Sequence, residues 1–315
     1  MKPIAGWTVA AFFVMTIGCG AGAVESEPVA GEGDAPSPEG AQQEKETSST
    51  STPATPEKPK TPSSPTKTLE LLTYNVAGLP QAISSVKPAE NTKKISPLLN
   101  PFDLVLVQED FAYHDDLVSA ATHPHKTPAM KALSPTDLGD GLNALARSPV
   151  SGLARTKWKQ CSGYFDQKND CLTSKGFASF TIDLGDGFSV DVYDVHFDAG
   201  RSDGDSKARY AQVAQLASAI NAQSKDRAVI VAGDTNMKDS DEATFQALLT
   251  NASLSCACRV LKCPEAARID RVMFRSSSSI AIVPKSYQVE SFVDAKGEPL
   301  SDHEPVNVVL ELSKP

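Results

Sequence analysis

Val229-Ile230-Val231-Ala232-Gly233-Asp234-Thr235-Asn236 is a short apolar run that ends in a Gly-Asp-x-Asn turn. A β-branched run bounded by glycine is typical of a buried strand. Asp234 and Asn236 lie two residues apart just past the strand, so their side chains are expected to point the same way at the rim of a sheet. Open α/β sheets bind their ligands at such strand ends. The stretch therefore predicts a strand that delivers an acid and an amide to a functional site.

Other predicted strands also have polar side chains at their ends. These are Tyr74-Asn75 after residues 69–73, Gln108-Glu109 after 104–107, His196 after 190–195, and Ser301-Asp302-His303 before 306–310. Together with residues 234–236, five strand ends supply a carboxylate, an amide or an imidazole. Exposed polar residues without a function would not be expected at five strand ends. We interpret these side chains as parts of one catalytic or metal-binding site.

The region from Thr68 onward mixes strand and helix patterns. Strands are predicted at residues 69–75, 104–108, 141–146, 176–183, 188–196, 228–232, 270–274 and 306–312. Helices are predicted at 88–99, 206–224 and 241–249; in the second, Val213, Leu216 and Ile220 form one apolar stripe. Many strands with few helices predict two sheets packed on each other and covered by helices from outside.

The N-terminus predicts export. Lys2 precedes an apolar run at residues 4–17, which is short for a membrane span and typical of a secretory signal peptide at residues 1–23. Two cleavage sites compete. Thr16-Ile17-Gly18-Cys19 resembles a bacterial lipobox, in which Cys19 would carry lipid and tether the protein to the cell envelope; Ala21-Gly22-Ala23 fits an ordinary cut and a secreted product.

Residues 24–67 are predicted to be a disordered linker, because their Pro, Ser, Thr, Glu and Lys residues cannot bury enough apolar area to offset the entropy of ordering. Residues 68–315 are then one catalytic domain. This domain has 25 Lys and Arg against 31 Asp and Glu, within a whole chain of net charge −9. Such a balance disfavours sequence-independent gripping of duplex DNA, which uses a basic footprint.

Five cysteines follow the signal peptide, and export favours disulfides among them. Cys161 and Cys171 bracket a polar span and are candidates for one bridge. Cys263 is a candidate partner for either Cys256 or Cys258. A zinc site built from the last three cysteines is the alternative, although no fourth ligand is obvious nearby.

The strand-end motifs, taken in order, resemble the endonuclease/exonuclease/phosphatase superfamily. They are Tyr74-Asn75, Gln108-Glu109, His196, Gly233-Asp234-x-Asn236, Ile269-Asp270-x-Val272 and Ser301-Asp302-His303-x-Pro305. The resemblance covers Leu69 to Leu312, and it implies an α/β (α+β) fold, a four-layer α/β/β/α sandwich of two packed mixed sheets. A monomer that acts on a phosphodiester substrate is expected.

The resemblance also implies a metal site. Glu109 corresponds to the principal metal ligand, with Asn75 beside it and Asp302 nearby. Hard oxygen ligands of this kind suit Mg²⁺, and Mn²⁺ or another divalent ion remains open. A bound cation of this type neutralises charge that develops on a phosphoryl group.

The remaining motif residues receive catalytic roles from the same resemblance. His303 would be the general base that accepts a proton from water, and Asp270 would orient its imidazole. His196 would donate to a phosphate oxygen or the leaving group. Asp234 would hold the attacking water or assist departure of the leaving group. Asn236 would bind a phosphate oxygen, and Asn75 would contribute to phosphate binding as well as to the metal site.

Other polar residues are expected to have structural or peripheral roles. Arg209 is expected to brace the fold from the helix after the His196 strand. His114, His123 and His125 are expected in a loop, without a catalytic role.

Two segments favour a sphingomyelinase-like branch of the superfamily. Lys175-Gly176-Phe177 resembles the Lys-Gly-Phe that opens a strand in bacterial sphingomyelinases, and Asp140-Gly141-Leu142-Asn143 stands where that branch has Asp-Gly-Gly. No aromatic-rich hairpin for membrane insertion is evident. The favoured function is a sphingomyelinase-like or phospholipase C-like phosphodiesterase. Alternatives are a secreted nuclease like deoxyribonuclease I, a phosphoinositide phosphatase and a non-catalytic binding lipoprotein.

Overall fold

The computed structural model describes residues 64–130, 138–163, 170–264 and 268–315. The predicted signal peptide and all but the last four residues of the predicted linker lie outside these ranges. Among the described residues, no helix combines the length and the apolar character that crossing a bilayer requires.

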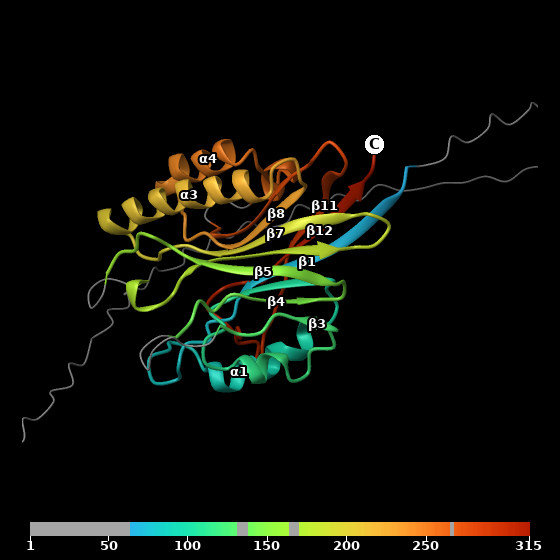
Figure 1. The fold of residues 1–315 in the computed structure, drawn as a ribbon. Helices are drawn as coiled ribbons and strands as arrows, with labels where there is room; N and C mark the ends of the chain where they lie inside the picture. The colour runs from blue at the N-terminus through green and yellow to red at the C-terminus, as the bar shows by residue number, and fades with distance from the viewer. Residues whose placement is uncertain (1–63, 131–137, 164–169, 265–267) are drawn as a thin grey trace, which may run out of the picture. The chain divides into compact units, whose positions relative to one another are not determined.

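The described strands form two six-stranded sheets, and each sheet mixes parallel with antiparallel pairs (Figure 1). The first sheet has the order β11 (Ala281–Val289), β12 (Val306–Ser313), β1 (Thr66–Asn75), β2 (Leu104–Gln108), β4 (Asn143–Ala146), β3 (His125–Lys126). The second has the order β5 (Val150–Lys157), β6 (Gly176–Asp183), β7 (Ser189–His196), β8 (Val229–Asp234), β10 (Asp270–Arg275), β9 (Ser255–Cys256).

Helices cover the outer faces of the two sheets. Their bounds are α1 (Pro88–Leu98), α2 (His114–Val118), α3 (Asp203–Gln223), α4 (Glu242–Asn251) and α5 (Ala257–Leu261), with 3₁₀ turns at Asp170–Leu172 and Asp239–Asp241. Figure 1 shows α3 and α4 over the second sheet and α1 on the opposite side, under the first sheet. The predicted four-layer sandwich is therefore confirmed.

Alternation along the strands sorts the apolar side chains into three buried layers. On β1, Leu71 faces the core between the sheets, whereas Leu72 faces the core beneath α1. On β8, Ile230 faces the core between the sheets and Val231 faces α3. Central strands that bury both faces explain why residues 229–232 are continuously apolar.

The ends of the domain meet at the end of β1 that lies away from the predicted site. Thr66 opens β1 and pairs with Ser313 of β12. Asn75 closes β1 at the other end, next to Gln108 of β2. The strand thus begins two residues inside the segment predicted as linker, and it runs from the chain termini of the domain toward the motif residues.

Two long strands were absent from the prediction. In β5, Gly152 has a positive φ and the register with β6 shifts between Ser151 and Ala154, so the alternation is interrupted. In β11, the register with β12 shifts between Pro284 and Ser286. Bulges of this kind remove the period-2 pattern by which strands are recognised.

The second predicted helix begins earlier than its apolar stripe. The helix α3 starts at Asp203, because Ser202 and Asp205 form a capping box: the Ser202 side chain accepts the Asp205 N–H, and the Asp205 side chain accepts the Ser202 N–H. The other two predicted helices match α1 and α4 to within one or two residues.

Two disulfides are present in the described residues, Cys161–Cys171 and Cys258–Cys263. The first is the predicted bridge, and the second selects Cys258 over Cys256 as the partner of Cys263. Because two of the three candidate zinc ligands are joined to each other, the zinc alternative is wrong. Cys256 is buried on β9.

The predicted loop location of three histidines is largely wrong. His114 opens the helix α2, where its ring nitrogen lies 2.5 Å from Asp110. His125 pairs with Ala146 in the short strand β3. Only His123 lies in a connecting segment, where it is buried against the carbonyl of Phe102.

Candidate active site

Strand register gathers three motif residues of the second sheet. The parallel pairing of β7 with β8 places His196 opposite Asp234, and the antiparallel pairing of β8 with β10 places Asp270 opposite the same residue. Asp234 is therefore the middle of a row of three functional side chains. All three are buried.

The first sheet brings Asn75 and Glu109 to this row. Asn75 ends β1, and its Nδ2 donates to Glu109 Oε1 at 3.1 Å and to Asp234 Oδ2 at 3.2 Å. One amide thus joins carboxylates from both sheets. Its Oδ1 accepts the N–H of Ala77, so the amide oxygen of Asn75 points away from Glu109 in this orientation.

Asp234 accepts hydrogen bonds on both of its carboxylate oxygens. Its Oδ1 accepts the Asn236 N–H at 2.8 Å, and its Oδ2 accepts Asn236 Nδ2 at 3.0 Å. Burial and the neighbouring charge of Asp270 raise the pKa of Asp234, while His303 and Lys175 oppose that rise. The orientation of this carboxylate is fixed, and its negative charge needs positive groups nearby.

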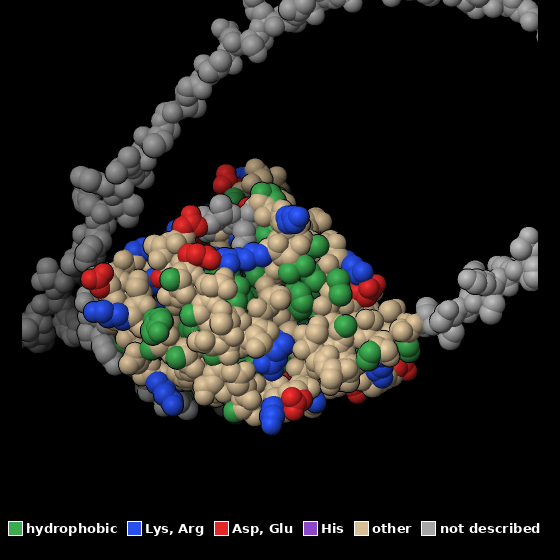
Figure 2. Space-filling model, turned by 90° about the horizontal axis from the view of Figure 1, so that it is seen from above, with side chains coloured by type: hydrophobic (Ala, Val, Ile, Leu, Met, Phe, Trp, Pro, Cys, Tyr) green, Lys and Arg blue, Asp and Glu red, His purple; other side chains and the backbone are tan. Residues whose placement is uncertain are grey.

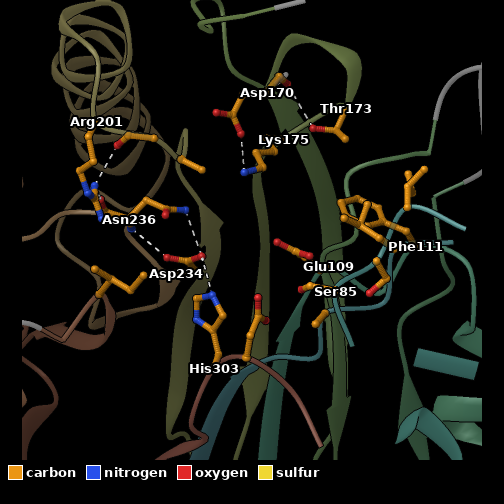
Figure 3. A pocket seen from close by; sticks show the side chains of 18 of the residues that line it. Ser85, Glu109, Phe111, Asp170, Thr173, Lys175, Arg201, Asp234, Asn236 and His303 are labelled. Atoms are coloured by element: carbon orange, nitrogen blue, oxygen red, sulfur yellow. Dashed lines mark hydrogen bonds and ion pairs between the residues drawn. The ribbon is translucent and has the colours of Figure 1, made fainter. Parts of the chain in front are cut away.

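His303 and Asp270 form an acid–imidazole pair. His303 Nδ1 lies 2.9 Å from Asp270 Oδ2 and 3.1 Å from Oδ1, which leaves Nε2 directed toward Asp234 at 3.8 Å (Figure 3). Burial alone would lower the pKa of His303, but the hydrogen bond and charge of Asp270, together with Asp234, raise it to about 10. In the metal-free site, His303 therefore carries its proton at neutral pH.

His196 has the opposite electrostatic character. It is fully buried, and neither ring nitrogen has a hydrogen-bond partner among the residues that the structure describes. Burial, and secondarily the positive charges of Lys175 and His303, hold the pKa of His196 well below its usual range. Its Nε2 lies 3.4 Å from Asp234 Oδ2, but a neutral ring makes this a contact and not an ion pair. A neutral imidazole with an unused nitrogen is suited to donate a hydrogen bond to an acceptor beside Asp234.

A pocket of about 660 Å³ opens at the strand ends, and its lining includes Glu109, Asp234, Asn236, Asp302 and His303. Asn75, His196 and Asp270 are buried beside these residues and do not line the pocket. Figure 3 shows that Glu109, Asp234 and His303 lie around its floor, with Lys175 above them. Lys175 pairs with Asp170 at 2.6 Å. Burial acts to lower the pKa of Lys175, yet Asp170 and Glu109 raise it above the usual value, so the ammonium stays charged.

Lys175 was not among the predicted site residues, although the Lys-Gly-Phe motif pointed to it. Arg201 and Lys238 also line the pocket without having been predicted. Arg201 lies in the loop two residues before α3 and donates to the carbonyl of Asn236 at 2.9 Å. No motif marked these two residues, because their place in the pocket depends on how the loops after β7 and β8 fold back.

The side chains around Glu109 suit a divalent cation. Burial raises the pKa of Glu109, although Lys175 and the Asn75 amide oppose the rise. The ionised carboxylate is therefore incompletely stabilised by its neighbours, and a bound cation would stabilise it. Asp302 lines the same pocket and is exposed. Among the described residues, the tightest group of potential ligands is Asp234, Asp270 and His303, whose ligand atoms lie within 4.8 Å of one another.

We favour Glu109 over that tight group as the principal ligand, because Asp270 is already bonded to His303. Asn75 would present its oxygen to a cation only after its amide rotates. A metal set of Glu109, Asn75 and Asp302 is compatible with the oxygen chemistry of the pocket. It stays a prediction.

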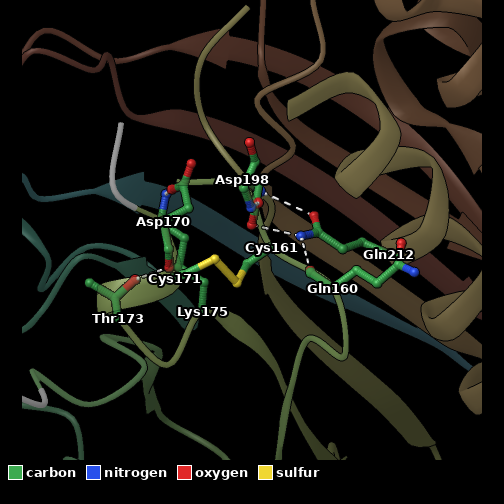
Figure 4. Close-up of a disulfide and its surroundings, with 9 residues drawn as sticks. Gln160, Cys161, Asp170, Cys171, Thr173, Lys175, Asp198 and Gln212 are labelled. Carbon is green, nitrogen blue, oxygen red and sulfur yellow. Dashed lines mark hydrogen bonds and ion pairs between the residues drawn. A yellow bond between two sulfur atoms is a disulfide. The ribbon is translucent and has the colours of Figure 1, made fainter. Parts of the chain in front are cut away.

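A disulfide lies beside the pocket (Figure 4). Cys171 directly follows Asp170, the partner of Lys175, and is joined to Cys161. The segment next to Cys161 is fixed as well, since the Ser162 N–H donates to Asp198 Oδ2 and Gln212 Nε2 donates to Asp198 Oδ1, both at 2.6 Å. The bridge therefore attaches Asp170 to the segment after β5, which is held by Asp198 and by Gln212 of α3.

Arg209 has the predicted bracing role. It is fully buried on α3, pairs with Asp241 at 2.9 Å, and donates to the carbonyls of Asp198 and Gly200. It thereby holds the segment that follows His196. Removing one partner of such a buried pair costs about 3–5 kcal/mol, because the other charge is left without compensation.

The chain is similar to known proteins over most of its length. The model of the Endonuclease/Exonuclease/phosphatase family matches residues 72–303. The sphingomyelinase of Mycobacterium tuberculosis is 35% identical over 261 residues, which cover 76% of this chain and 51% of that protein. The chain therefore spans about half the length of the curated relatives it matches.

Solved structures share the fold at lower identity. TDP2 from D. rerio, complexed with a single-strand DNA product, gives a TM-score of 0.61 at 17% identity and covers 77% of this chain and 98% of that one. A double mutant of beta toxin from Staphylococcus aureus, with bound magnesium ions, gives 0.56 at 17% identity and covers 77% of this chain and 99% of that one. With its motif residues gathered at the same strand ends and a family match over residues 72–303, the chain belongs to the endonuclease/exonuclease/phosphatase family.

Proposed function

We propose that this protein is a Mg²⁺-dependent phosphodiesterase that releases phosphocholine from sphingomyelin-type lipids. The observation that carries the proposal is a pocket lined by Glu109, Asp234 and His303. The buried side chains of Asn75, His196 and Asp270 contact these three residues. The similarity to a sphingomyelinase over three quarters of the chain supports the lipid substrate. Mn²⁺ or another divalent ion could replace Mg²⁺ in such an oxygen-rich site.

Bound at Glu109, a divalent cation would supply charge neutralisation for the phosphoryl oxygens. The protein's own residues do the remaining work. The imidazolium form of His303 would be disfavoured beside a bound cation, and neutral Nε2 is then placed to accept a proton from an attacking water. Asp270 fixes the tautomer by holding Nδ1. Asp234 lies between the two histidines and orients that water. His196 Nε2 donates to a phosphate oxygen.

Asn236 and Lys175 complete the arrangement. Asn236 Nδ2 donates one hydrogen to Asp234 Oδ2 and the other to the carbonyl of Phe197, so it fixes Asp234 and would have to exchange one of these partners to bind a phosphate oxygen. The buried ammonium of Lys175 offsets the negative charge of Glu109 and Asp234. A doubly negative floor would otherwise repel a phosphodiester anion.

The pocket mouth favours a lipid over a nucleic acid. Leu79, Ile83 and Phe111 line one wall, and the side chain of Ile83 is 66% exposed. An apolar wall beside a phosphate site suits a substrate with a hydrocarbon part. Figure 2 shows a different face, the side of the domain that carries α3 and α4; on it, Lys and Arg are interspersed with Asp and Glu, without the continuous basic surface that duplex DNA attracts.

A single assay tests the proposal. The full-length protein is incubated with sphingomyelin, phosphatidylcholine and plasmid DNA, each with Mg²⁺ and with EDTA. We expect EDTA-sensitive release of phosphocholine and intact plasmid. Nicking of the plasmid with both lipids untouched would instead establish a nuclease, and inactivity on all three would refute the phosphodiester substrates and turn the search to phosphoinositides.

We further propose that the protein is exported and tethered through a lipid on Cys19. The secretory pattern of residues 1–17 and the following Cys19 support this location. Full-length protein expressed in bacteria should partition into the detergent phase of a Triton X-114 separation, and Cys19→Ser should move it to the aqueous phase. Equal partitioning of both proteins would exclude the lipid anchor.

A further inference from the structure

Glu109 has an unusual backbone conformation. Its φ is +59°, in the left-handed region that residues other than glycine rarely adopt. Holding a residue there costs of order 1–3 kcal/mol, so the surrounding structure must impose it. In the strand-end turn that follows β2, the Glu109 carbonyl accepts the N–H of Gly78 at 3.0 Å and of Phe111 at 2.9 Å.

The segment 138–143 encloses this turn from the other side. The carbonyl of Gly141 accepts the Asp110 N–H at 3.0 Å. Gly141 has a φ of +65°, and a Cβ there would lie 2.6 Å from the Phe111 ring and 3.0 Å from the Glu109 Cα. The position of Gly141 therefore determines where the backbone of Glu109 can lie.

Arg155 controls the position of Gly141. It comes from β5, the edge strand of the second sheet, whereas the segment it contacts belongs to the first sheet. Arg155 Nη1 lies 2.7 Å from both oxygens of Asp140, and Nη2 donates to Asn143 Oδ1 at 2.8 Å. The residues on both sides of Gly141–Leu142 are thus held by one guanidinium.

A second branch reaches the turn through side chains. Asn143 Nδ2 donates to Asp110 Oδ2 at 2.8 Å, and the same oxygen contacts His114 Nδ1. Asp110, Asp140 and Asn143 are each no more than 3% exposed. The guanidinium of Arg155 is therefore connected to the Glu109 turn by two routes. One runs through Asp140 to the backbone of Gly141, and the other runs through Asn143 to the carboxylate of Asp110.

We propose that Arg155 is a positioning residue for Glu109: it holds the left-handed turn, and it thereby sets the affinity of the pocket for its divalent cation. The inference rests on the proposed function, in which Glu109 is the principal cation ligand. Groups that orient a metal ligand from behind typically change metal affinity about 10- to 100-fold when they are removed. The planar guanidinium makes five hydrogen bonds, to Asp140, Leu142, Pro128 and Asn143, and a point charge does not replace it.

The test compares Arg155→Met and Arg155→Lys with the wild type. Mg²⁺ binding to the full-length protein is measured by isothermal titration calorimetry, and kcat and KM are measured on sphingomyelin over a range of Mg²⁺ concentrations. We expect Arg155→Met to weaken Mg²⁺ binding about 10- to 100-fold, with kcat partly restored at high Mg²⁺. Arg155→Lys should fall between Arg155→Met and the wild type.

Arg227→Met is the matched control, because it also removes an Arg–Asp pair from the second sheet: Arg227 lies 2.7 Å from Asp191. Asp191 lies near the start of β7, whereas the pocket lies at the end of that strand. It should leave Mg²⁺ binding unchanged. If Arg155→Met does not fold, as judged by circular dichroism, Asn143→Ala removes only the side-chain branch and should weaken binding by a smaller factor in the same direction.

The outcomes separate the inference from the function. Wild-type Mg²⁺ affinity in folded Arg155→Met and Asn143→Ala would overturn the positioning role. Weakened binding in the variants, with a wild type that binds Mg²⁺ but hydrolyses no lipid, would support the positioning role and refute the proposed substrate. A wild type that binds no Mg²⁺ would overturn both at their shared premise.

Discussion

Glu109→Gln is expected to lower kcat/KM by a factor of about 10³ or more, which corresponds to roughly 4 kcal/mol of transition-state stabilisation. The amide is nearly the same size as the carboxylate, but it carries no charge with which to hold a divalent cation. Steady-state hydrolysis of sphingomyelin and calorimetric titration of Mg²⁺ would measure the two losses. Activity within a few-fold of the wild type would remove Glu109 from the site.

The same variant should not destabilise the metal-free fold. Because burial raises the pKa of Glu109, the folded protein keeps this proton over a pH range in which the unfolded chain has already lost it. The free energy of unfolding therefore falls as pH rises through that range, and Glu109→Gln should remove this contribution. Glu242→Gln, on the exposed surface of α4, is the control for both measurements.

His303→Asn is expected to reduce kcat by about 10²–10⁴, the usual contribution of a positioned acid–base group. The pKa of about 10 adds a sharper expectation. In EDTA, the imidazole signals of His303 in an NMR titration should change near that pH. They should change at lower pH when Mg²⁺ is present, because a nearby cation disfavours the imidazolium.

The pH dependence of activity follows from the sign of this shift. If neutral His303 accepts the proton, kcat rises with pH until the ring is deprotonated. Asp270→Asn removes the group that raises the pKa, so the rise should move to lower pH while the maximum rate falls. His125→Asn, in the short strand β3, provides a histidine control. An unchanged pH profile in Asp270→Asn would contradict the pairing.

The site was more predictable from sequence than the edges of the fold. Asp234 and Asn236 follow a continuously buried strand, and the hydrophobic pattern alone indicates where that strand ends. By contrast, β5 and β11 carry register shifts, so their alternation breaks and sequence reading passes over them. Central strands are specified by burial on both faces; edge strands depend on a neighbour that the sequence does not reveal.

The supporting residues were also difficult to predict, for a related reason. Nothing near Arg155 in the sequence indicates that its guanidinium reaches Asp140 across the two sheets. Lys175 was marked by a motif, but its pairing with Asp170 depends on the folding of the segment closed by Cys161–Cys171. Strand ends are local features, whereas the groups that orient them are brought together only by tertiary structure.

The direction of β1 determines on which side of the domain the pocket opens when the protein is immobilised or anchored through one of its termini. This ten-residue strand begins beside the C-terminal strand β12 and ends in the pocket, so it spans about 30 Å at roughly 3.3 Å per residue. An affinity tag, a solid support or a lipid at either end would leave the pocket opening at the far side of the domain. If the domain is tethered through its N-terminus, its pocket can face lipids of the same membrane only when the linker is long enough for the domain to reorient.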